Sequence, residues 1–352
     1  MNAIAEFLYG ILESITGVVQ NHGVSIIIFT ILMRLVCVPF DYKSRKGMRK
    51  MAAIQPKLAA LQKKYANDKQ KYQQKQAELM RKEHYNPLSS CLPMLLTWPL
   101  MIAMFTAMRS IANEQLAMQA FRYLLGEENP IQPADAFLWI KNIWMTDSPF
   151  AAIAPDANSL SMLTQEVWNK VISSFSAEQL STITASIQAA VPDFAGFDFA
   201  TKEAMQASVA AINGALQQTP AYQSAVATVP GWTNVSFILF SITVFVKNNG
   251  LLILPVLAGL TQVLQTKFNP QMREQEKAQA AANGQQNGTG NFMKYFFPAL
   301  SVFFCLTSNA GFALYWVTSN VVMWGMSIVM TKILEKQDEK KAAEIAGEGT
   351  VK

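Results

Sequence analysis

Arg34 is the side chain in this sequence whose surroundings most need a chemical explanation. It lies inside the apolar run IIIFTILMRLVCVPF, residues 26–40. A charge at the centre of a bilayer costs from about 2.5 to more than 10 kcal/mol, and water or lipid headgroups that reach it lower this cost. Either the Arg34 side chain extends along its helix to the membrane surface, or it faces a water-filled cavity between helices.

Polar side chains in other apolar runs favour the cavity. They are Thr261, Gln262 and Gln265 in one run, and Trp316, Ser319, Asn320 and Ser327 in another. A single polar residue in such a run can be explained by one bond to a neighbouring helix. Polar faces on several runs instead suggest a shared hydrated pocket. Because no Asp or Glu lies within these runs, the charge of Arg34 remains available to a molecule that enters.

The residues that usually perform covalent or metal chemistry are sparse. The three cysteines, at positions 37, 91 and 305, are far apart, and the histidines are only His22 and His84. This spacing fits neither a metal site nor a disulfide framework. The sequence also contains no glycine-rich phosphate loop, nucleophile elbow or HExxH motif. We therefore expect no enzyme activity, cofactor or metal.

The composition is typical of a membrane protein. Hydrophobic residues make up 51% and charged residues 15% of the 352 residues, whereas soluble domains carry about 25% charged residues. Five apolar runs account for the difference, at 24–40, 88–108, 249–266, 292–307 and 311–333. A spanning helix needs about 17–25 residues, so the third and fourth runs are marginal. The shorter run 235–246 is expected to lie at the interface or against the bundle.

Charge asymmetry predicts the orientation of the spans. Residues 41–88 carry 13 Lys and Arg against 4 Asp and Glu, and residues 111–246 carry 4 against 11. Basic loops stay in the cytoplasm, so the first loop is predicted to be cytoplasmic and the long loop extracytoplasmic. Five spans with an outer N-terminus and a cytoplasmic C-terminus satisfy this pattern. The net charge of +5 then reflects topology, and no specific nucleic-acid partner is expected.

These signals predict an all-α integral membrane protein with five transmembrane helices. The predicted parts are an interfacial amphipathic helix at 1–22, transmembrane helices at 23–42, 88–110, 249–267, 292–308 and 309–333, a cytoplasmic coiled-coil hairpin at 43–87, an extracytoplasmic helical insert at 111–248, a cytoplasmic loop at 268–291 and a cytoplasmic tail at 334–352.

The two polar segments carry their own patterns. Apolar residues from Met51 to Tyr65 recur at steps of 3 and 4, as in a coiled-coil seam, and the turn-prone residues 66–68 separate them from a second arm. Short links at 41–42 and 86–87 are expected to join this hairpin to the membrane. The alternative is a solvated loop near anionic lipid headgroups.

In the insert, Ser176 and Gln179 fit a helix capping box, and residues 201–218 suggest a further helix. The insert is expected to cap the bundle.

Six sequence blocks resemble the YidC-type membrane protein insertases. They are TILMRLVCVPF, KGMRKMAAIQPKLAALQKKY, NPLSSCLPMLLTWPLMIAMF, FLWIKNIWMTDSP, LPVLAGLTQ and FPALSVFFCLTSNAGFALYWVTSN. They cover roughly 25–150 and 249–333 in the order of the family. The resemblance is to the shorter bacterial members, without the large extracytoplasmic domain. The chain departs from the pattern at 150–248, where about 100 residues separate two blocks that usually lie close together.

The resemblance implies a five-helix core with a groove open to the cytoplasm and to lipid. It matches Arg34 to the arginine of that groove, and it places Gln262 and Trp316 among the residues that line it. Asn320 joins them from the polar face of the last run. The implied function is that of an insertase and chaperone in the bacterial plasma membrane, which releases nascent membrane proteins into the bilayer. The Sec translocon and the ribosome are further candidate partners.

Two other functions remain open. A small-solute channel or transporter would also need hydrated polar faces, but it favours inverted repeats and broken helices. The sequence contains no internal repeat, and its polarity is one-sided. A membrane-anchored scaffold would need the hairpin but not Arg34.

Overall fold

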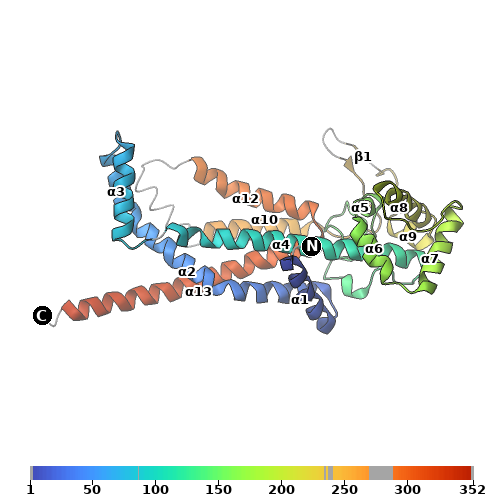
Figure 1. Cartoon of the computed structure of the whole chain (residues 1–352), viewed down its shortest axis with the longest axis horizontal. Helices are drawn as coiled ribbons and strands as arrows, with labels where there is room; N and C mark the ends of the chain where they lie inside the picture. Colours follow the sequence, from blue (N-terminus) through green and yellow to red (C-terminus); the bar gives the residue numbers. More distant parts are fainter. Residues whose placement is uncertain (1–2, 86, 234, 237–240, 269–287, 350–352) are drawn as a thin grey trace. The chain divides into compact units, whose positions relative to one another are not determined.

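The fold, taken from a computed structural model, is mostly helical (Figure 1). The structure describes residues 3–85, 87–233, 235–236, 241–268 and 288–349. The helices are α1 (Ala3–Val19), α2 (His22–Lys64), α3 (Lys69–Lys82), α4 (Pro87–Leu124), the 3-10 helix η1 (Pro133–Asp135), α5 (Ala157–Ser161), α6 (Gln165–Ser173), α7 (Ala177–Ala190), α8 (Lys202–Leu216), α9 (Pro220–Ala225), α10 (Ile253–Phe268), α12 (Gly288–Thr307) and α13 (Ala310–Gly349), and the strands are β1 (Val235–Ser236) and β2 (Ser241–Ile242).

The chain divides into two compact units. The first contains Met1–Phe29, Ala103–Leu257 and Val302–Trp316, and we call it the outer unit after the insert that is predicted to be extracytoplasmic. The second contains Thr30–Ile102, Ala258–Ser301 and Val317–Lys352, and we call it the seam unit after the polar contacts between α2 and α13 that are described below. The long helices pass from one unit into the other, so each unit is built from segments that are distant in the sequence.

Within the described residues, two helices are long and apolar enough to cross a membrane, namely His22–Lys64 and Ala310–Lys340. The other three predicted spans fall in α4, α10 and α12. The side chains of 88–98, in the second predicted span, lie outside the described residues, as does the predicted loop 268–291 for most of its length. The predicted tail is helical, because α13 continues to Gly349.

The predicted link at residues 41–42 is wrong. Helix α2 runs without a break for 43 residues from His22 to Lys64, with Pro39 and Pro56 inside it. Helix propagation is cooperative, and the Lys-, Arg- and Ala-rich sequence that follows residue 42 favours helix. At about 1.5 Å per residue, α2 is about twice as long as the 30 Å hydrocarbon layer. The first arm of the hairpin is therefore a direct extension of the first apolar helix.

The last part of α2 and α3 form an antiparallel hairpin in the seam unit. Asp68 caps α3 by accepting a 3.0 Å hydrogen bond from the amide of Lys71. Ile54, Leu58 and Tyr85 are buried together between the arms. Lys57 Nζ lies 2.5 Å from Glu83 Oε1, which joins the start of one arm to the end of the other. The apolar coiled-coil face predicted from the spacing of residues is thus the contact face of the hairpin.

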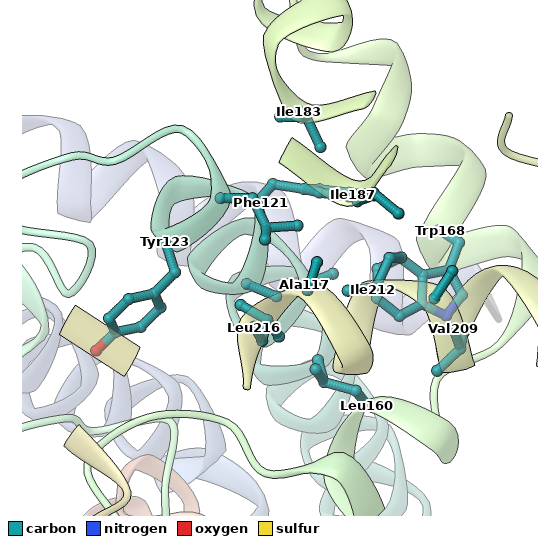
Figure 2. Packing of buried hydrophobic residues seen from close by; sticks show 14 of the residues in the cluster. Ala117, Phe121, Tyr123, Leu160, Trp168, Ile183, Ile187, Val209, Ile212 and Leu216 are labelled. Atoms are coloured by element: carbon teal, nitrogen blue, oxygen red, sulfur yellow. The ribbon is translucent and has the colours of Figure 1, made fainter. Parts of the chain in front are cut away.

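The insert forms a helical subdomain with its own core in the outer unit. Trp168, Ile183 and Ile212 are fully buried from three different helices and pack with the outer end of α4 (Figure 2). The predicted capping box is confirmed, since Ser176 and Gln179 exchange side-chain and backbone hydrogen bonds at the start of α7. The predicted helix at 201–218 is also confirmed as α8, capped by Thr201.

The short apolar run 235–246 is partly extended. Val235–Ser236 pairs antiparallel with Ser241–Ile242, and residues 237–240 lie outside the described part of the chain. Beyond β2, Phe245 forms an isolated bridge with Thr228. The β-branched residues of this run favour strand.

Candidate functional site

Arg34 lies in a line of polar contacts between α2 and α13. We call this line of contacts the polar seam, and it belongs to the seam unit. Its guanidinium donates to Ser319 Oγ from both Nε, at 2.8 Å, and Nη2. Farther along the same two helices, Arg45 Nη1 donates to Ser327 Oγ at 2.7 Å. Ser319 and Ser327 are almost fully buried. Since both partners advance together along the sequence, α2 and α13 run parallel.

A second set of contacts brings α10 to the polar seam. The Asn320 side-chain amide donates to Thr261 Oγ1 at 3.2 Å. Asn320 is almost fully buried, and a buried amide needs such a partner. Gln262 follows Thr261 on α10 and is half-buried. The structure therefore brings Arg34, Asn320 and the helix that carries Gln262 into one unit.

Trp316 is placed differently from the other predicted groove residues. It belongs to the outer unit, where its ring centroid lies 5.7 Å from that of Phe312 and 6.5 Å from that of Phe304. Phe304 lies in the last turn of α12 and Phe312 in the first turn of α13, so these rings pack across the tight turn between the two helices. In the outer unit, Trp316 is part of an aromatic cluster.

Sequence reasoning missed Arg45 and Arg49 as members of the polar seam. Arg49 Nη1 lies 3.0 Å from Asp338 Oδ2, and Arg49 Nη2 lies 3.6 Å from Glu335 Oε1. These carboxylates lie in the helical extension of α13, which the sequence did not predict. The signal was the arginine spacing, because positions 34, 45 and 49 differ by near-multiples of the helical repeat and so share a face of α2.

The surface of the seam unit has the reverse polarity of a soluble protein. Leu35 and Val36 on α2 are 54% and 65% exposed, and Val329 on α13 is 57% exposed. The polar side chains of Ser319, Asn320 and Ser327 are buried instead. Contiguous exposed apolar surface is rare in soluble monomers and marks contact with a membrane or a partner. The apolar face fits lipid and the polar seam is sheltered from it.

Trp144 of the motif FLWIKNIWMTDSP belongs to a buried polar network around Asp135 in the outer unit. Asp135 Oδ1 accepts a 2.6 Å hydrogen bond from Trp144 Nε1 and lies 3.0 Å from His22 Nδ1. Gln119 Nε2 lies 3.3 Å from Asp135 Oδ2. Asp135 is 1% exposed, and a buried carboxylate is tolerated only with several such donors. The network attaches the start of α2 to the insert and to α4.

Asp147 anchors the start of α10 in the same network. Its two carboxylate oxygens accept hydrogen bonds of 2.8 and 2.7 Å from the amides of Leu251 and Leu254. Anionic groups are stabilised at helix N-termini by free amides and the helix dipole. Gly250 has to be glycine here, because a Cβ at this position would lie 2.0 Å from Asp147 Oδ1.

Helix α1 is attached to the insert by a charged cluster. Leu8 and Leu12 are buried, whereas Ile4, Phe7 and Val18 are exposed. Tyr9 donates to Glu13 at 2.6 Å and also lies 2.9 Å from Glu114 Oε2. Lys170 on α6 lies 2.8 Å from the Glu114 carboxylate and 4.6 Å from the centre of the Tyr9 ring. The exposed apolar face fits a helix that rests on lipid.

Attachment of α1 is expected to weaken at alkaline pH. Burial raises the pKa of Tyr9, and its hydrogen bond to Glu13 and the charge of Glu114 raise it further. The pKa of Tyr9 in the folded chain lies above its value of about 10 in the unfolded chain. The contribution of protonated Tyr9 to the stability of the folded state is therefore complete below about pH 10 and is lost as the pH rises above that value. Fluorescence anisotropy of a dye on Ser14→Cys should fall above pH 10. Tyr9→Phe, which keeps Lys170 and Glu114, should not show that step, and an identical step in both proteins would contradict the assignment.

Comparison with known proteins identifies the family. The family model described as 60Kd inner membrane protein matches residues 14–202 and 211–338. The chain is 36% identical over 163 residues to the membrane protein insertase YidC of Coxiella burnetii (strain Dugway 5J108-111), covering 46% of this chain and 25% of that protein. It is 32% identical over 157 residues to YidC of Clostridium tetani (strain Massachusetts / E88), covering 44% of this chain and 63% of that one.

A third relative, YidC of Francisella tularensis subsp. novicida (strain U112), is 31% identical over 166 residues, which are 47% of this chain and 27% of the relative. The chain thus spans from about a quarter to just under two thirds of the length of these relatives. The family model, in contrast, covers most of the chain. The chain belongs to the 60Kd inner membrane protein family, the family of the YidC insertases.

Proposed function

We propose that this protein is a membrane protein insertase of a bacterial inner membrane, which binds nascent membrane proteins along the polar seam and releases them into lipid. The observation that carries the proposal is Arg34, a cation in an apolar, lipid-compatible helix whose hydrogen-bond partner is the neutral Ser319. No described carboxylate forms an ion pair with it. A structural arginine in lipid would be expected to have such a counter-ion.

The proposed mechanism is electrostatic and involves no covalent step. Arg34 has five N–H donors, and Ser319 takes only two of them among the described residues. A polar or acidic segment that enters the groove loses its hydrogen bonds to water and forms new ones to these donors, to Gln262 and to Asn320. Because the groove is polar, the segment crosses a shorter distance of hydrocarbon. Apolar segments then leave sideways past the exposed leucine and valine side chains of α2 into the bilayer.

The hairpin is proposed to face the cytoplasm and to meet substrates before they enter the groove. It is basic, and the residues buried between its arms are few. The ribosome and the Sec translocon are proposed as further partners, on the basis of the family alone. The insert, with its acidic surplus and independent core, is proposed to lie on the opposite side of the membrane.

Labelling of single cysteines tests this orientation. Lys64 at the end of α2 and Ala210 on α8 are both exposed, so either position accepts a cysteine without disturbing the packed core. In a background with Cys37, Cys91 and Cys305 replaced by serine, an impermeant maleimide should label the Ala210 variant in intact cells and the Lys64 variant only after lysis. Labelling of both from one side would contradict the topology.

Reconstitution tests the function itself. The purified chain in lipid vesicles should insert a short, two-span test protein whose outer loop becomes resistant to protease only when the chain is present. The same vesicles should not release a trapped small solute. Release of solute without protected substrate would favour the channel or transporter instead.

A further inference from the structure

The outer unit contains a cavity that the polar seam does not use. It has a volume of about 610 Å³ and is lined by the outer part of α4, the α12–α13 turn and loops of the insert. Ligand-binding pockets typically measure about 300–1,000 Å³, so the cavity is of a size that holds a small ligand or a few residues of a peptide. We call it the outer cavity.

One part of the outer cavity is aromatic. Phe105 and Phe312 pack edge to face, with ring centroids 5.1 Å apart, and Phe304 also lines the space. Such rings offer a large apolar surface to an aromatic or aliphatic side chain. Because these rings come from α4, α12 and α13, the surface is formed by the fold rather than by one segment.

A cation faces the same space. Arg109 and Asn113 lie one helical turn apart on α4, and both line the cavity. Neither side chain forms a hydrogen bond or an ion pair with the described residues. Asp156 also lines the cavity, but its carboxylate accepts a hydrogen bond from the amide of Ser159 and caps α5. Arg109 and Asn113 therefore present donors to whatever enters the cavity.

The polar lining distinguishes between possible occupants. Thr146 and Ser308 also line the cavity, which leaves no continuous apolar wall for an acyl chain. Extended backbone lies on the rim, where Ala152 bridges Asn248 and Phe245 bridges Thr228. These features favour an extended peptide with one apolar side chain and one carboxylate close together.

We propose that the outer cavity binds a short extended segment of the extracytoplasmic tail of an inserted protein. A large apolar side chain of the tail packs on Phe105, Phe304 and Phe312, and a neighbouring carboxylate accepts hydrogen bonds from Arg109 and Asn113. The proposal rests on the proposed insertase function for the identity of the tail. It gives the insert a role in holding a segment that has already crossed the membrane, which slows its return.

The test is direct peptide binding to the full chain in nanodiscs of phosphatidylcholine. The probe is a fluorescent synthetic peptide with a Phe-Glu pair between serine and glycine residues. Loss of a charge-assisted hydrogen bond weakens binding by about ten- to a hundredfold, and this is the loss expected for Arg109→Gln. Lys202→Gln, which removes an exposed cation of the insert outside the cavity, should bind the peptide as the native chain does.

A second peptide locates the carboxylate. Replacing its Glu by Gln should weaken binding to the native chain but not to Arg109→Gln, because that variant has already lost the partner. A photoreactive residue at Phe150, which lines the cavity, should crosslink the peptide. Equal binding by Arg109→Gln and the native chain would overturn the proposal. So would crosslinking to phosphatidylglycerol with loss of peptide binding when that lipid is added. Binding requires no insertion, so failure of the vesicle assay and failure of this proposal are separate outcomes.

Discussion

Arg34→Ala is expected to reduce insertion of a substrate with an acidic extracytoplasmic tail by about ten- to a hundredfold, the equivalent of one charge-assisted hydrogen bond. The fold should survive, because Arg34 forms no ion pair with a described residue and the substitution removes only its hydrogen bonds to Ser319. The measurement is protease protection of the tail in reconstituted vesicles. Since exposed electrostatic attraction is screened by salt, the difference between Arg34→Ala and the native chain should shrink at high ionic strength.

Three comparisons separate this effect from general damage. Arg34→Lys should keep part of the activity, because it retains the charge but loses the planar guanidinium. Ser319→Ala should keep most of it, because it frees the Arg34 donors without removing them. A substrate whose tail has Gln in place of each acidic residue should be inserted almost equally by all these proteins. The native chain could instead insert both tails equally, and Arg34→Ala could leave both unchanged. That result would support an Arg34 side chain that only extends to the membrane surface.

Asp147→Ala is expected to produce a large loss of stability, of about 3–5 kcal/mol. The substitution leaves the buried amide of Leu254 and the part-buried amide of Leu251 without acceptors, and an unsatisfied buried donor costs about 1–3 kcal/mol. Loss of the negative charge at the start of α10 adds to this. At about 2–4 °C per kcal/mol for a chain of this size, the melting temperature in detergent should fall by roughly 10 °C.

Asp147→Asn separates the charge from the hydrogen bonds. It keeps an acceptor oxygen and should lose only the interaction with the helix dipole, about 0.3–2 kcal/mol. Gly250→Ala should resemble Asp147→Ala, since its Cβ would displace the carboxylate. Asp193→Ala removes an exposed carboxylate of the insert and is the matched control. A melting temperature for Asp147→Ala equal to that of this control would show that α10 is anchored by other contacts.

Local patterns in the sequence predicted the local structure well. Apolar spacing from Met51 to Tyr65 indicated the contact face of the hairpin, and Ser176 and Thr201 indicated where two helices of the insert begin. These features depend on residues within a few turns of one another, so they can be read without the fold. The link expected at residues 41–42 is instead part of a continuous helix, because a change from apolar to basic composition changes the surroundings of a helix but not its backbone.

Arg34 shows the limit of the same reasoning. The sequence alone determined that a cation lies within an apolar helix and that polar faces exist on other helices to meet it. Only the tertiary structure decided that Ser319 is its partner and that Arg45 and Arg49 continue the same line along α13. It also decided that Trp316 packs with Phe304 and Phe312. Likewise, Asp147 reaches amides more than 100 positions away, and the outer cavity combines three separate parts of the chain. Such contacts follow from the packing of distant segments, which local spacing and composition do not specify.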